Sequence, residues 1–99
     1  MKVKVKVRKA NTSSVGLSIG AAFMLARDIA DQLDHFRVQA WKDDAEMPVH
    51  TWGSMAGDTV SEIGRHGAWG PAFTDGECDF IKVIDDDLNK VIETILVNG

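Results

Sequence analysis

The sequence predicts an α+β fold, a two-layer sandwich in which a sheet of about four mostly antiparallel strands carries two main helices packed on one face. Three observations lead to this prediction. Residues 2–9 and 35–41 alternate apolar and polar side chains, which is the period of a half-buried strand. Residues 20–34 and 85–98 instead place their apolar residues at helical spacing. No repeat, linker or low-complexity segment divides the sequence, so we expect a single α+β domain over residues 1–99.

The first half of the chain is predicted to contain a strand, a helix and a hairpin. In residues 2–9 three valines alternate with cations, which is typical of a strand with one wet face. After a turn at 11–14, the helix over 20–34 gathers its apolar residues on one arc and its charges on the other. Residues 35–41 and 48–52 should then pair as a hairpin, with a proline at a strand start where no ladder donor is needed.

The second half is predicted to hold a short helix, a central strand and the second main helix. Thr59 followed by Glu62 matches a capping box, and Gly64 would end the short helix that the box begins. Residues 78–84 are apolar enough for a central strand. The acids that open 85–98 suit a helix N-terminus, and a narrow apolar stripe follows them: Leu88, Val91, Ile92, Ile95 and Leu96.

The core is predicted where the strand and helix periodicities meet on one face of the sheet. Its expected members come from the strands and from the apolar side of each helix. They are Val3, Val5, Val7, Phe23, Ile29, Leu33, Phe36, Val38, Ile81, Val83, Leu88, Ile92 and Ile95. Met24 falls on the polar arc of the first helix, so we expect it to be exposed.

Charge is segregated along the chain. The net charge is −4, but five of the eleven cations lie within the first nine residues, so residues 10–99 carry six cations against fifteen acids, a balance of −9. An acidic body repels phosphates, and nucleic acid is therefore not an expected partner. The basic start followed by an apolar run resembles a secretory signal, but its strand-like alternation argues against one. No stretch approaches the ~20 apolar residues of a membrane span. We expect a cytoplasmic protein, because a single cysteine without a disulfide partner suits a reducing compartment.

The segment over residues 50–76, which we call the 50–76 segment, is the predicted functional surface. It holds six of the nine glycines, two of the three tryptophans and two of the three histidines. Large aromatic and imidazole side chains on a glycine-rich segment are typical of a surface that packs against or binds something. The residues predicted to contact a ligand or partner are His50, Trp52, Arg65, His66 and Trp69.

Catalytic and metal signatures are incomplete. His50, His66 and Cys78 match no ligand spacing that places two donors on one helical face or knuckle. The acids on either side of Cys78 would raise the pKa of its thiol rather than activate it. As the only cysteine, it also has no partner for an internal disulfide. We therefore predict no metal, no cofactor and no catalytic residue.

The most economical function is that of a non-enzymatic binding protein, an acidic inhibitor-type or accessory protein that recognises a partner macromolecule through the 50–76 segment. One alternative is sequestration of a small anionic, nucleotide-like ligand, and another is a small enzyme with His50 or His66 as general base. A second contact surface is predicted as an acidic patch for a basic partner. It consists of Glu77, Asp79, Asp85, Asp86 and Asp87. We also expect a homo-oligomer, because the first strand would expose backbone groups if it lay at a sheet edge.

Overall fold

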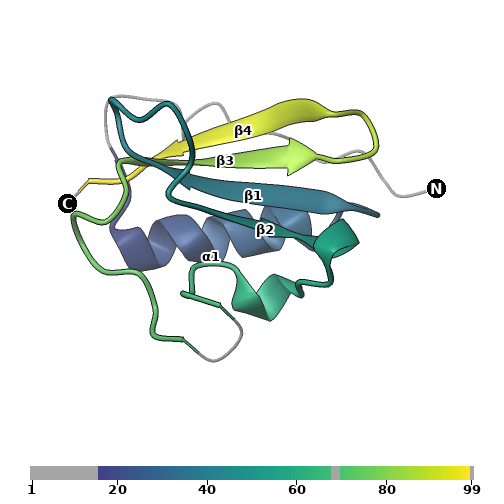
Figure 1. Ribbon diagram of the computed structural model, residues 1–99, viewed down its shortest axis with the longest axis horizontal. Coiled ribbons are helices and arrows are strands. Elements are labelled where there is room, and N and C mark those ends of the chain that lie inside the picture. The colour runs from purple at the N-terminus through teal and green to yellow at the C-terminus, as the bar shows by residue number, and fades with distance from the viewer. Residues whose placement is uncertain (1–15, 68–69, 99) are drawn as a thin grey trace.

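The computed structural model describes residues 16–67 and 70–98. Within them the helix α1 (Ile19–Ala30) lies along one face of a four-stranded antiparallel sheet (Figure 1). The α+β class and the antiparallel sheet of four strands are confirmed, whereas the described residues form one main helix and not two. The strands, in the order β2-β1-β3-β4 across the sheet, are β2 (His50–Gly53), β1 (Phe36–Trp41), β3 (Phe80–Asp85) and β4 (Lys90–Leu96).

Helix α1 confirms the predicted amphipathic helix, although it ends four residues earlier than expected. Ser18 caps it, because its hydroxyl accepts a hydrogen bond from the amide of Ala21 at 3.3 Å. Three alanines on its apolar side let the helix backbone approach the sheet closely, and two larger residues fill the space beside them. The buried residues are Ala22, Phe23, Ala26, Ile29 and Ala30, while Met24 is exposed as predicted.

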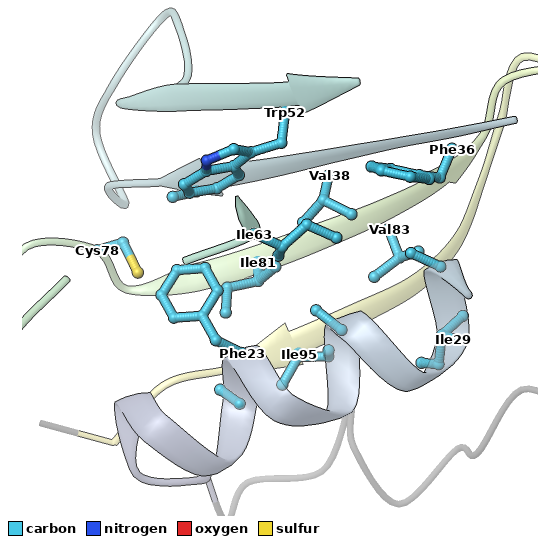
Figure 2. Packing of buried hydrophobic residues seen from close by; sticks show 14 of the residues in the cluster. Phe23, Ile29, Phe36, Val38, Trp52, Ile63, Cys78, Ile81, Val83 and Ile95 are labelled. Carbon is cyan, nitrogen blue, oxygen red and sulfur yellow. The ribbon is translucent and has the colours of Figure 1, made fainter. Parts of the chain in front are cut away.

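The hairpin of β1 and β2 and the pairing of β1 with β3 place alternate side chains on opposite faces of the sheet. Val38 in β1 is opposite Trp52 on one side and Val83 on the other, and all three side chains are buried. These residues face α1 and build the core seen in Figure 2. We call the opposite surface of the sheet the outer face.

The chain between β2 and β3 folds back over the end of the core. Two short 3₁₀ turns, η2 (Ser54–Ala56) and η3 (Val60–Glu62), follow β2. The predicted capping box is confirmed at the start of η3, where the amide of Thr59 donates to the Glu62 carboxylate at 2.6 Å. The residues after η3 add three buried side chains to the core that the periodicity did not predict: Ile63, Phe73 and Cys78. Figure 2 shows Ile63 and Cys78 among the core residues.

The predicted helix over 85–98 is wrong, because this stretch forms the turn and second strand of a hairpin with β3. The acids do not cap a helix. Instead the carboxylate of Asp85 accepts hydrogen bonds from the amides of Asp87 and Leu88, and Asn89 closes the turn with φ of 53°. The following residues are rich in β-branched side chains, which favour a strand once a neighbouring strand is available to pair with them.

This change of element alters the predicted core at the C-terminal end. Leu88 lies in the turn and is 68% exposed, so its assignment to the core is wrong. Ile92 is partly buried at the point where the register of β3 and β4 shifts, and Ile95 is fully buried opposite Ile81. Glu93 is buried on the core side opposite Val83.

The remaining core predictions divide into two groups. Phe23, Ile29, Phe36, Val38, Ile81 and Val83 are buried as expected, and Leu33 packs against the cluster from its edge. The predicted first strand over residues 2–9, with Val3, Val5 and Val7, lies outside the described residues, as does Trp69.

Candidate functional site

Trp52 is the residue of the 50–76 segment that strand β2 turns furthest into the protein. It is 1% exposed, and its ring meets that of Phe23 nearly edge-on at a centroid distance of 5.6 Å (Figure 2). The ring of Phe73 meets it in the same way at 5.5 Å. Its indole N–H donates to the backbone carbonyl of Arg65 at 3.0 Å. Trp52 is therefore a core residue that supports the loop above it, and its ring is not presented to a ligand.

His66 lies flat on the ring of Phe73 at the surface. The two ring centroids are 4.0 Å apart and the planes differ by 10°. The loop between them is closed by two backbone hydrogen bonds, from His66 to the carbonyl of Pro71 and from Phe73 to the carbonyl of Gly64, both 2.9 Å long. Gly70 is required there, because a Cβ atom would collide with the carbonyl oxygen of His66. The loop thus holds an exposed imidazole in one orientation.

Glu77 fixes the imidazole from the other side. Its carboxylate lies 2.8 Å from Nε2 of His66 and also accepts hydrogen bonds from the amide and hydroxyl of Thr74. These bonds favour the ionised form, so the pKa of Glu77 lies below its usual value, chiefly because of Thr74 and to a lesser extent because of His66. Because a carboxylate only accepts, Nε2 of His66 carries a proton, and Nδ1 is the acceptor when the ring is neutral.

His50 and Arg65 complete this part of the surface. The half-buried ring of His50 lies 4.6 Å from the ring of Trp52 and 6.5 Å from that of Phe73. Arg65 is exposed, and its guanidinium forms no ion pair with any residue that the structure describes. We call His50, Arg65, His66 and Phe73 together the histidine rim. It unites three of the five predicted contact residues around a phenylalanine that the sequence did not single out.

The five predicted acidic residues lie at the two ends of β3 and not in one patch. Glu77 and Asp79 precede the strand, and Asp85, Asp86 and Asp87 end it or follow it. At a rise of ~3.3 Å per residue the two groups are about 20 Å apart. Four of the five carboxylates lie 2.8 to 3.6 Å from a cation or an imidazole. Much of their negative charge is therefore compensated within the protein.

Cys78 is buried beside the loop, and burial, with smaller effects of Asp79 and Glu77, raises the pKa of its thiol to about 11. A thiol in this state is a poor nucleophile near neutral pH. Over residues 16–67 and 70–98, no three His, Cys, Asp or Glu side chains are grouped so that they could hold a metal ion. None of the helices in those ranges is long and apolar enough to cross a membrane.

Phe73 and Thr74 are the two site residues that sequence reasoning missed. Phe73 stands within a stretch of glycine, proline and polar residues, and such a stretch has no periodicity that marks a buried position. The one signal for Phe73 in the sequence is that it is a large apolar residue within a stretch that is otherwise rich in glycine and polar residues. Comparisons of the chain with models of protein families, with curated protein sequences and with solved structures gave no match.

Proposed function

We propose that this protein is a non-enzymatic binding protein that recognises a partner macromolecule through the histidine rim. The observation that carries the proposal is the way His66 is held, stacked on Phe73 and hydrogen-bonded to Glu77 while its ring stays accessible. A surface side chain that is already ordered loses little conformational entropy on binding. Rigid aromatic and cationic groups of this kind are typical of residues that dominate the energy of protein interfaces.

The chemistry of the rim favours an acidic partner. Arg65 presents donors that pair with carboxylates in two-point geometry, and no described acid occupies them. His66 adds a second cation when it is protonated. The partner that fits is a protein with a carboxylate-bearing surface, which would act in an inhibitor-type or accessory interaction. Self-association and a cytoplasmic location stay predictions.

The two alternative functions receive less support. Sequestration of a nucleotide-like ligand relied on Trp52 or Trp69 stacking on a base. Trp52 is buried, and Trp69 lies outside the described residues. An enzyme with His66 as general base draws support from the oriented imidazole, since a carboxylate fixes its tautomer as in many catalytic pairs. Cys78, the residue after Glu77, does not add a nucleophile to the pair of His66 and Glu77. It is buried, and the pKa of its thiol is raised.

The proposal is tested by charge reversal at the rim. The wild-type protein is immobilised and exposed to lysate of its source cells, and retained proteins are identified and cross-linked. We expect a retained protein whose binding is lost with Arg65→Glu and weakened with His66→Ala. Lys90→Glu is the matched control, because it makes the same change in charge at another exposed position. If every retained protein binds the Arg65→Glu and Lys90→Glu variants equally, the histidine rim is not a recognition surface.

A further inference from the structure

The outer face of the sheet differs in charge from the rest of the residues that the structure describes. Residues 16–98 carry six cations and fifteen acids, yet within the described part of the chain the only charged side chains that strands β1 to β4 turn outward are Arg37 and Lys82. The outward positions follow from the alternation and register of the four strands. They are Arg37, Gln39, Trp41, Thr51, Gly53, Phe80, Lys82, Ile84, Val91, Thr94 and Leu96.

Two aromatic rings lie together on this face. Trp41 in β1 and Phe80 in β3 are direct cross-strand partners, and their rings are almost parallel, 3° apart in plane with centroids 6.1 Å apart. The indole N–H of Trp41 donates to the side-chain oxygen of Gln39 at 3.0 Å, which fixes the ring's orientation. Both aromatic residues are half-buried, so part of each remains accessible. The pair forms an ordered apolar surface on the two central strands.

Lys82 lies over this pair. Its ammonium nitrogen is 4.5 Å from the centroid of the Trp41 ring and 5.8 Å from that of Phe80, a cation–π arrangement. Arg37, by contrast, is 3.5 Å from the carboxylate of Asp86 and donates to Asn89. Lys82 forms no ion pair with a carboxylate in the described part of the chain. Its charge is therefore held in place by aromatic rings but not neutralised.

We propose that the outer face around Trp41 binds an acidic segment of a partner protein. A carboxylate of that segment would pair with Lys82, and a neighbouring apolar side chain would cover the rings of Trp41 and Phe80. The inference stands on charge complementarity and on the ordered aromatic pair, and it does not depend on the histidine rim, whose residues gather with Trp52 on the core side of the sheet.

A protein segment fits this face better than a nucleic acid strand does. Stacked rings beside a lysine are also typical of surfaces that bind single-stranded nucleic acids. However, the acids at both ends of β3 flank the face, and residues 10–99 carry a net charge of −9. Four of these five acids are paired within the protein, but a phosphate chain that extended past Lys82 would still carry one charge per nucleotide toward an acidic end of β3. A segment with one carboxylate at Lys82 would not.

The test uses NMR titration of the full chain with three probes. They are a soluble peptide in which leucines are flanked by glutamates, the same peptide with glutamines in place of the glutamates, and oligothymidylate. We expect the acidic peptide to shift the Trp41 indole resonance and to bind about tenfold or more weakly to Lys82→Glu and Lys82→Met. Lys90→Glu serves as the control for net charge and should bind as the wild type does, and so should Arg65→Glu.

Three results would overturn the proposal. The first is the absence of any Trp41 shift with the acidic peptide, and the second is equal binding of the acidic and glutamine peptides. The third is tighter binding of oligothymidylate than of the acidic peptide with the same dependence on Lys82, which would assign the face to nucleic acid. Lys82→Met covers the case in which Lys82→Glu does not fold, because it keeps an unbranched side chain of similar length and removes the ammonium group without adding a negative charge.

Discussion

The indole nitrogen of Trp52 donates a hydrogen bond to the backbone carbonyl of Arg65 across 3.0 Å, and this contact joins strand β2 to the loop that carries the histidine rim. The same ring packs against Phe23 and Phe73, so one side chain connects helix, sheet and loop. A change at Trp52 should therefore disturb both the stability of the fold and the position of His66, although Trp52 itself is not exposed to a partner.

The Trp52→Phe variant tests this connection. It removes the donor and leaves the carbonyl of Arg65 without its partner, which costs about 1 to 3 kcal/mol, in addition to the smaller ring. We expect a lower denaturation midpoint and shifted His66 resonances. Trp41→Phe is the control, because the indole N–H of Trp41 donates to the side chain of Gln39 in the same strand and not to the backbone of a described loop. If the two variants lose the same stability and His66 is unmoved in both, Trp52 does not anchor the loop.

Gly64 should be intolerant of any side chain. Its φ is +91°, and a Cβ atom there would lie 2.8 Å from Cγ of Phe23. Gly64→Ala combines left-handed strain with overpacking against a buried ring, and we expect a loss of roughly 2 to 4 kcal/mol. Gly57→Ala, at a φ of +93° with nothing within 4 Å, should cost only the backbone term, roughly 1 to 2 kcal/mol. Equal losses in urea denaturation would contradict the close packing of Phe23 on Gly64.

The C-terminal hairpin predicts different losses of stability for Ile95→Ala and Leu88→Ala, whereas a helix would place both side chains on its apolar stripe. Ile95→Ala removes a fully buried side chain of β4 and should cost about 2 to 5 kcal/mol. Leu88→Ala changes an exposed turn residue and should leave the stability within about 0.5 kcal/mol of wild type. Thermal and chemical denaturation of the two variants measure the difference. Comparable losses at both positions would support the helix that the apolar stripe suggested.

His35 gives the fold a dependence on pH. Its Nδ1 lies 2.8 Å from the carboxylate of Asp87, and this hydrogen bond, with the charges of Asp87, Asp34 and Asp86, raises the pKa of His35 above its ordinary 6.5. Because the folded pKa is raised, the pair's contribution to stability is fully present below pH 6.5 and is lost as the pH rises through the folded pKa.

NMR titration of the His35 ring measures that pKa directly. In Asp87→Asn we expect it to fall toward 6.5, because the charged partner is gone, whereas Asp43→Asn, an acid beyond the other end of β1, should leave it unchanged. The stability difference between wild type and Asp87→Asn should shrink as the pH is raised. A His35 pKa that is the same in all three proteins would show that the pair does not form in solution.

Local sequence chemistry alone predicted a large share of this fold. Helix α1, the hairpin of β1 and β2, and the capping box at η3 each follow from interactions within a few residues, namely apolar spacing, a turn between alternating runs, and a side chain that caps its own helix. Four of the five described residues with positive φ are glycines of the 50–76 segment, whereas its role as a functional surface stays a prediction.

What the sequence could not decide is what each pattern packs against. The spacing of the apolar residues in 88–96 is compatible with either a helix or a strand. These residues form a strand because they pair with β3. The alternation of residues 35–41 places Trp41 on the face opposite Phe36 and Val38, beside Lys82. Trp52 had no such signal, and its pairing with Val38 turned it into the core. Backbone periodicity is local, but burial and the meeting of His66, Phe73 and Glu77 depend on contacts between distant segments, which only the tertiary structure supplies.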